Sequence, residues 1–179
     1  SGLLEALGYT FSPAFKPLEE GTIPVIGEVN KKSGAPDLWI LETLSPISET
    51  SDPLEVAIDS IQYQTDFPPL VEYKDCLLQT TVSELITTHI FSQAEPPRWL
   101  LIANFHSLVL IDRSKWNEKR FLRFDFTEIF SRKEASTLKT MASLLHRDSL
   151  TPDDGTPLLD TLNENSHKHA FEVSEDLKY

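Results

Sequence analysis

The sequence contains little cysteine and glycine, and it has no long apolar run. Cys76 is its single cysteine, so the chain cannot form an internal disulfide, as is typical of a reducing cytoplasm. Its 6 glycines are scattered singly, which excludes a glycine-rich loop around a phosphate group. No apolar segment is long enough to cross a membrane, and the N-terminus does not read as a signal peptide. We therefore expect a cytoplasmic protein without a membrane partner.

Basic residues are also scarce, since 16 Lys and Arg stand against 28 Asp and Glu, a net charge of −12. Residues 1–97 hold 15 acids and 4 bases (net −11), and residues 151–179 hold 7 acids and 2 bases (net −5). Residues 98–150, with 6 acids and 10 bases, have a net charge of +4. Phosphate is attracted by local positive charge, so only this middle segment is a candidate for contact with nucleic acid. The alternative is a solvated helix face.

Apolar runs predict a mixed β-sheet. Residues 23–29 and 37–44 flank a turn with Gly and Pro and predict a hairpin. Residues 98–105 and 108–112 predict a second hairpin, and the alternating residues 121–126 predict a half-buried strand. The strand within residues 37–44 is apolar on both faces, so we expect it to be central and covered on both sides.

Helices are expected around this sheet. Residues 3–9 predict a short helix that is ended by a glycine. Capping-box patterns predict helix starts at Thr81 and Ser131, and residues 158–171 favour a further helix. The proline-containing residues 10–21 are expected to be a connector.

The order of these elements predicts an α/β (α+β) fold, with a mixed β-sheet flanked by helices and a helical C-terminal extension. We assign residues 1–150 to one domain and residues 151–179 to a helical linker. A new helix cap at Ser174 is followed by only five residues, too few for a stable helix. We therefore expect the chain to continue into a further domain.

Several whole phrases carry a resemblance to a known family: LLEALGY near the start, RWLLIANFHSLVLIDRSKW (98–116), RFLRFDFTEIF (120–130) and the segment 144–179. They resemble the N-terminal region of large bacterial adenine-specific DNA methyltransferases of restriction–modification and phage-defence systems, the type IIG-like class. The resemblance implies a parent protein that binds DNA and S-adenosylmethionine, with a methyltransferase domain downstream. This chain lacks methyltransferase motifs, so no cofactor is expected in it.

N-terminal regions of that class often resemble PD-(D/E)XK nucleases, which implies a restriction-endonuclease-like fold. In such a site one strand carries Asp and the next carries Glu-x-Lys. The two acids hold Mg²⁺, and the lysine lies near the metal-bound water. Here Glu42 matches the glutamate, but Val25 stands in place of the aspartate and Leu44 in place of the lysine. We therefore expect a degenerate site.

A displaced catalytic set is the alternative. It consists of Glu28, Asp37 and Glu42 as Mg²⁺ ligands, with Lys31 or Lys32 as the base. Asp37 and Glu42 are an odd number of positions apart on one strand, so their side chains should point to opposite faces. Glu28 and Glu42 are expected to be able to meet across the hairpin.

A basic stretch in the middle segment is the best candidate for DNA contact. Its bases are Arg113, Lys115, Lys119, Arg120 and Arg123. Such side chains contact phosphates, and Trp116, Phe121 and Phe124 among them would anchor the chain. The alternative is that these aromatics belong to the core and the bases are solvated.

The remaining candidates give no metal site. Cys76 has no histidine at a local spacing that would make a catalytic dyad. His167 and His169 are two positions apart, so on a helix they point away from each other.

The leading hypothesis is a catalytically degenerate nuclease-like module, used for DNA contact or interdomain docking in a DNA-modifying defence protein. The alternatives are an active Mg²⁺-dependent endonuclease domain and a protein-interaction module that recruits a separate nuclease or regulator.

Overall fold

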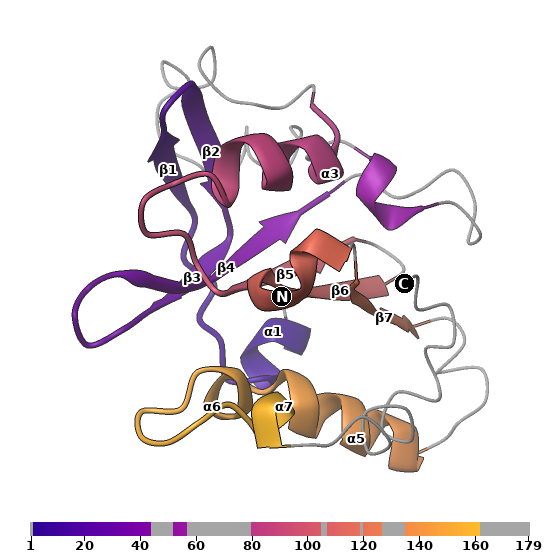
Figure 1. Ribbon diagram of the computed structural model, residues 1–179. Helices are drawn as coiled ribbons and strands as arrows, with labels where there is room; N and C mark the ends of the chain where they lie inside the picture. The colour runs from indigo at the N-terminus through magenta and orange to yellow at the C-terminus, as the bar shows by residue number, and fades with distance from the viewer. Residues whose placement is uncertain are drawn as a thin grey trace.

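The structure is a computed structural model of the 179-residue chain. It describes residues 2–43, 52–56, 80–104, 107–118, 120–126 and 135–161. A five-stranded sheet lies in the middle, with helical segments above and below it in the view of Figure 1. The predicted α/β class and mixed sheet are confirmed.

The sheet has the strand order β3-β4-β5-β6-β7. Its strands are β3 (Gly27–Asn30), β4 (Pro36–Glu42), β5 (Trp99–Ala103), β6 (Ser107–Asp112) and β7 (Leu122–Asp125). Strands β4 and β5 run parallel, and all other neighbours are antiparallel. Parallel neighbours need a crossover connection, which residues 43–98 provide. The second hairpin and the strand after it are confirmed as predicted.

The first predicted strand, residues 23–29, is divided between two sheets. Its first part belongs to β2 (Gly21–Val25), which pairs with β1 (Ala14–Leu18) in a separate antiparallel hairpin. The interpretation of residues 10–21 as a connector was therefore wrong. Pro17 favoured that interpretation, but proline is tolerated in a strand that has a free edge.

The chain passes from β2 to β3 at Gly27, where only a glycine fits. A Cβ atom there would lie 2.9 Å from Thr10 O and 3.1 Å from Ile40 Cδ1. The backbone of the segment before β1 therefore packs directly on the β3–β4 pair. Ser12 N donates to Ile26 O at 2.8 Å and fixes this contact.

Helices α1, α5, α6 and α7 lie on one side of the sheet (Figure 1). Their bounds are Gly2–Ala6, Ala135–Leu145, Arg147–Leu150 and Leu158–Thr161. The Tyr9 hydroxyl donates to Leu145 O at 2.7 Å, and Arg147 N donates to Leu7 O at 2.9 Å. Gly8, at a φ of +87°, ends the first helix as predicted.

The other side of the sheet carries α3 and its continuation η3 (Figure 1). The helical segments outside the first group are η1 (Pro53–Glu55), α3 (Val82–Glu84), the π-helical η3 (Leu85–Ile90) and the 3₁₀ segment η4 (Arg113–Glu118). Thr81 Oγ1 accepts a hydrogen bond from Glu84 N at 3.3 Å, which confirms the predicted cap.

Strands β4 and β5 form the centre of the core. Residues with no exposed surface include Leu38, Ile40, Leu41, Trp99, Leu100 and Leu101. This confirms that the strand before Glu42 is central and covered on both faces.

Some predictions fall outside the described residues. The expected helix start at Ser131 precedes the first described residue of α5, and the segment from residue 162 onward is not described. The domain boundary at residue 150 and the helical linker therefore stay predictions.

Candidate functional site

The three carboxylates of the displaced nuclease set lie apart. Glu28 is directly opposite Trp39 in the β3–β4 ladder, so these two residues share one face of the sheet. Glu42 lies three positions beyond Trp39 on β4 and therefore points to the other face. The expectation that Glu28 and Glu42 meet across the hairpin was wrong. Asp37 lies at the opposite end of β4 from Glu42, so the three do not converge on one cation position.

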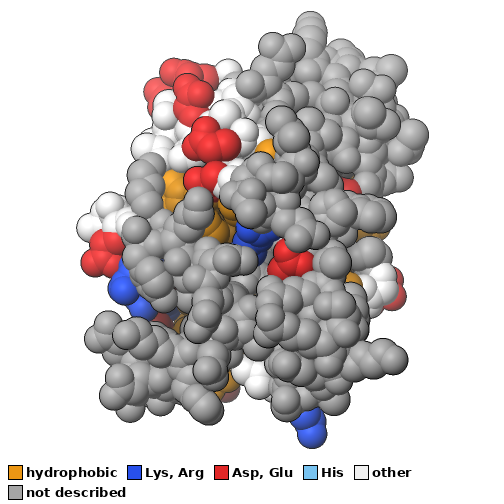
Figure 2. Space-filling view, turned by 90° about the vertical axis from the view of Figure 1, so that its right-hand side faces the viewer, with side chains coloured by type: hydrophobic (Ala, Val, Ile, Leu, Met, Phe, Trp, Pro, Cys, Tyr) orange, Lys and Arg blue, Asp and Glu red, His pale blue; other side chains and the backbone are white. Residues whose placement is uncertain are grey.

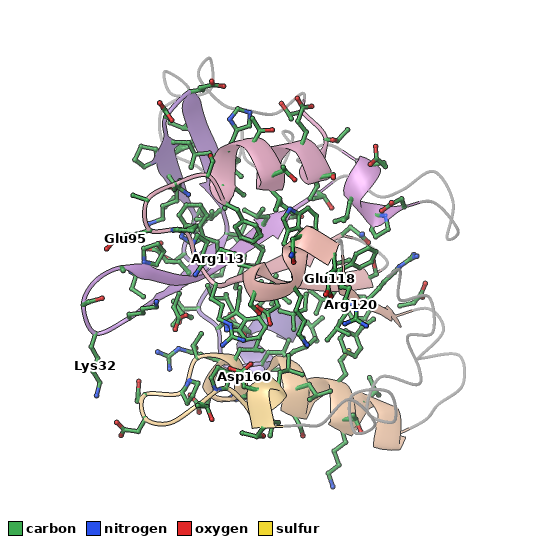
Figure 3. The ribbon with its side chains drawn as sticks, viewed as in Figure 1. Lys32, Glu95, Arg113, Glu118, Arg120 and Asp160 are labelled. Carbon is green, nitrogen blue, oxygen red and sulfur yellow. The ribbon has the colours of Figure 1, made fainter. Side chains whose placement is uncertain are left out.

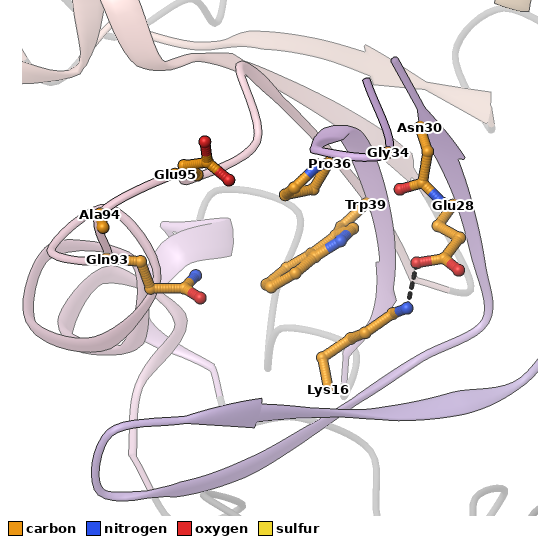
Figure 4. A pocket seen from close by; sticks show the side chains of 9 residues that line it. All are labelled: Lys16, Glu28, Asn30, Gly34, Pro36, Trp39, Gln93, Ala94 and Glu95. Atoms are coloured by element: carbon orange, nitrogen blue, oxygen red, sulfur yellow. Dashed lines mark ion pairs between the residues drawn. The ribbon is translucent and has the colours of Figure 1, made fainter. Parts of the chain in front are cut away.

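Glu28 is instead engaged by Lys16 of β1, with which it forms an ion pair (Figure 4). Lys16 was not predicted to be a site residue, because residues 10–21 were expected to be a connector. The expected bases, Lys31 and Lys32, are exposed in the turn between β3 and β4. Lys32 Nζ lies 3.9 Å from Asp154 Oδ1. Both expected bases therefore lie at the end of the β3–β4 hairpin opposite Glu42.

The aspartate and lysine positions of the nuclease pattern are occupied by the apolar residues Val25 and Leu44. Val25 is fully buried at the end of β2. Leu44 lies just outside the described residues.

Asp37 has an altered acidity. Burial raises the pKa of its carboxyl group above the ordinary value, and the positive charges of Lys31 and Arg98 oppose part of that shift. A raised pKa favours the neutral acid, whereas a cation ligand has to be ionised. Burial therefore disfavours the ionised form of Asp37.

The basic stretch is organised around η4, the turn between β6 and β7. At its start, Asp112 Oδ1 accepts hydrogen bonds from Ser114 N at 3.0 Å and from Ser114 Oγ at 2.8 Å. Arg113 N donates to Arg98 O at 2.9 Å. With the backbone fixed in this way, the side chains of Arg113 and Lys115 are exposed.

Trp116 anchors this turn to the helical layer. Its side chain is buried, and Nε1 donates to Thr87 Oγ1 at 3.1 Å. Its ring meets Phe91 edge-to-face, with 6.2 Å between the ring centroids. Phe121 and Phe124 are buried as well. The alternative given for the three aromatics is therefore confirmed, since they belong to the core, and Trp116 also holds η4 in place.

The remaining bases differ in exposure. Arg120 is partly exposed and pairs with Glu118 at 3.3 Å, and both lie to the right of Arg113 in Figure 3. Arg123, which we expected on the surface, is only 5% exposed and lies 3.8 Å from Asp125. It is buried because β7 is covered on both faces at this point. Lys119 falls outside the described residues.

No protein family, curated protein or solved structure matches this chain. The function therefore has to be argued from the site itself.

A cluster of charge that the sequence analysis missed surrounds Arg98. Its guanidinium donates two hydrogen bonds to Asp160, both at 2.6 Å, and two to Asp112, at 3.2 and 3.3 Å. It also lies 4.4 Å from the centre of the Trp99 ring. These contacts raise the pKa of Arg98, so it stays charged. The predicted hairpin, in which Trp99 pairs with Asp112, could have indicated the contact of Arg98 with Asp112. The contact with Asp160 could not be predicted, because Asp160 comes from a helix distant in the sequence.

Electrostatics limit what the basic turn can do alone. On the face seen from the right of Figure 1, basic and acidic side chains lie side by side (Figure 2).

Within the described ranges, no group of three or more His, Cys, Asp or Glu could hold a metal ion. His89 lies 3.6 Å from Glu20, and His146 Nδ1 accepts from Asp148 N at 3.1 Å, so both histidines have local partners. Among the described helices, none is long and apolar enough to span a membrane.

Proposed function

We propose that this chain is a catalytically degenerate, nuclease-like module that contacts DNA phosphates for a larger bacterial restriction–modification or phage-defence protein. The observation that carries the proposal is the rigid turn η4, which holds Arg113 and Lys115 toward solvent. Methylation, with its S-adenosylmethionine, would belong to the parent protein.

The element order supports the nuclease-like part of the proposal. A short helix precedes the strands, β3 and β4 form a hairpin that ends in Glu42, and a crossover then leads to the parallel strand β5. The resemblance implies a strand pair that ends in the glutamate, then a helix and a later hairpin. The separated carboxylates and the apolar Val25 support the loss of cleavage.

The charge set supports contact with phosphate groups rather than with bases. Arg113, Lys115 and Arg120 come from one turn, and Arg120 shares its charge with Glu118. Each phosphate neutralised by a cation lowers the logarithmic salt slope of binding by about 0.9. Two or three such contacts give weak binding that is sensitive to salt, as suits a module that positions a larger protein on DNA.

The test is fluorescence anisotropy with a fluorescent duplex at several low salt concentrations. Arg113→Ala combined with Lys115→Ala should weaken binding and should reduce the salt slope by about 2. Lys31→Ala combined with Lys32→Ala removes the same charge from the β3–β4 turn and should leave binding unchanged. Equal effects of the two double variants would reject a specific role for η4.

Cleavage is tested separately by plasmid nicking with Mg²⁺ or Mn²⁺. We expect none, because the described acids do not converge. Metal-dependent nicking that is lost in Glu42→Ala would replace this proposal with an active endonuclease domain.

A further inference from the structure

A groove opens beside the β3–β4 hairpin. It has a volume of about 610 Å³, which is in the range of ligand sites. It is lined by Lys16, Glu28, Asn30, Gly34, Pro36, Trp39, Gln93, Ala94 and Glu95. In Figure 3, Glu95 lies at the left, Arg113 to its right and Arg120 further to the right. The lining of the groove includes no residue of η4.

Trp39 leaves one hydrogen bond unmade in this groove. The residue is 4% exposed, and among the described residues Nε1 has no acceptor. Figure 4 shows the indole between Glu95 and Gln93 on one side and Lys16 and Glu28 on the other. A buried N–H without an acceptor is unfavourable, because the hydrogen bond to water lost on burial is not replaced. A bound ligand that brings a carbonyl oxygen would remove that cost.

The charged and amide groups of the groove favour a cationic ligand. Lys16 and Glu28 neutralise each other, so the exposed Glu95 leaves the lining with one negative charge. Gln93 Nε2 donates to Ile90 O at 2.9 Å, which leaves its carbonyl oxygen as an acceptor. All lining residues come from residues 1–97, a segment with a net charge of −11. Negative charge attracts cations and repels phosphate.

We infer that this groove binds an arginine-bearing peptide segment of a partner protein. The guanidinium donates to Glu95 and to the Gln93 carbonyl, and its planar face packs on the Trp39 ring. A backbone carbonyl of the same segment accepts from Trp39 Nε1. This nitrogen is shielded from solvent, so exposed side chains of the groove have to change rotamer first, which is a fast motion.

The three tryptophans provide the assay. In a ¹H–¹⁵N spectrum of the full chain, each indole N–H gives one signal, assigned with Trp39→Phe and Trp99→Phe. Trp116 Nε1 already donates to Thr87 Oγ1. Trp99 Nε1 is buried without an acceptor in the described part of the chain and does not line the groove, so its signal is an internal control.

The probes are acetyl-Gly-Arg-Gly-amide and its citrulline analogue, which has the same shape without the charge. Titration with the arginine peptide should shift the Trp39 signal downfield and saturate, whereas the Trp99 and Trp116 signals stay in place. The citrulline peptide should bind at least about five-fold more weakly, as expected for one partly exposed charge pair. Equal affinity of the two peptides, or equal shifts of all three signals, would overturn the inference.

A charge variant makes the test specific to the groove. Glu95→Gln should weaken the arginine peptide about five-fold, and Glu19→Gln, which removes an exposed acid outside the groove lining, should not. If both variants behave alike, or if a neutral disaccharide shifts Trp39 where the arginine peptide does not, the assignment fails. The probes carry no phosphate, and Arg113→Ala with Lys115→Ala should bind them normally. The inference and the proposed DNA contact can therefore fail separately.

Discussion

Replacing Asp160 by Asn should loosen the attachment of α7 to the sheet. The change keeps the shape of the side chain and one hydrogen-bond acceptor, but it removes the negative charge that meets Arg98. Both Arg98–Asp160 contacts are 2.6 Å long. Arg98 keeps Asp112 as a second partner, so its charge is not left unpaired.

The expected loss follows from exposure. The Arg98 and Asp160 side chains are 24% and 37% exposed, and ion pairs at such sites contribute roughly 0.2–1 kcal/mol, with bidentate geometry at the upper end. We therefore expect the free energy of unfolding to fall by about 1 kcal/mol, which lowers Tm by about 2–4 °C for a chain of this size. Asp112→Asn should cost more, about 2 kcal/mol, because Asp112 is 15% exposed and also caps η4 through Ser114.

Urea denaturation followed by circular dichroism measures the free energies of unfolding of Asp160→Asn, Asp112→Asn and a control variant. Asp153→Asn, an exposed acid in the preceding turn, is the control and should change the unfolding free energy by less than about 0.5 kcal/mol. The Asp160→Asn loss should shrink at 1 M salt, because a partly exposed pair is screened. If Asp160→Asn and Asp153→Asn are indistinguishable, the pair does not hold α7 in solution and the reasoning is refuted.

Three further changes test other parts of the fold by the same measurement. Tyr9→Phe should cost about 1 kcal/mol, because the hydrogen bond to Leu145 O is lost and the ring packing is kept. In Gly8→Ala the backbone strain at a φ of +87° alone should cost about 1–2 kcal/mol. The total loss should be larger, because the new Cβ would lie 3.0 Å from His146 Cε1. Asp37→Asn should stabilise the chain at neutral pH, because burial raises the pKa of Asp37 in the folded state. The stability of the wild type therefore falls as the pH rises from the ordinary value of 3.8 through the raised pKa, and the neutral Asn avoids this loss.

Each change has an outcome that contradicts it. Gly155→Ala, at a φ of +88° with nothing within 4 Å of the new Cβ, measures the backbone cost alone and should be milder than Gly8→Ala. An Asp37→Asn gain that persists below pH 3.8, where the wild-type carboxyl group is neutral in both states, would show that its charge is not the cause. A Tyr9→Phe variant as stable as wild type would mean that water replaces the hydroxyl.

The sequence predicts the central strands well and the peripheral ones poorly. The runs around Trp39 and Leu101 are apolar throughout. Such a run predicts burial on both faces even when the neighbouring strands are not known. β1 was missed because Pro17 within it favours a connector, although it pairs with β2 at a free edge. Arg123 was misjudged because alternation shows which side of a strand a residue takes, but not whether that side is covered.

The candidate site was harder to predict than the core. That Asp37 and Glu42 lie at opposite ends and on opposite faces of β4 follows from strand parity, and the structure is consistent with it. The place of Glu28 depends on the register of the hairpin, which was read so that Glu28 would meet Glu42. The pair of Lys16 with Glu28 joins two separate sheets, and the contact of Asp160 with Arg98 joins segments far apart in the chain, so neither could be predicted from composition and spacing.

The parallel pairing of β4 with β5 also bears on how the chain folds. Leu38 pairs with Trp99, 61 positions away, whereas β5, β6 and β7 follow one another through short connections. Closing the long loop loses chain entropy before any contact is gained, so β5–β7 should form first and β4 should join late. Substitutions such as Val109→Ala should then slow folding, and Ile40→Ala should mainly speed unfolding. The segment that carries Glu42 would be the last part of the sheet to become ordered.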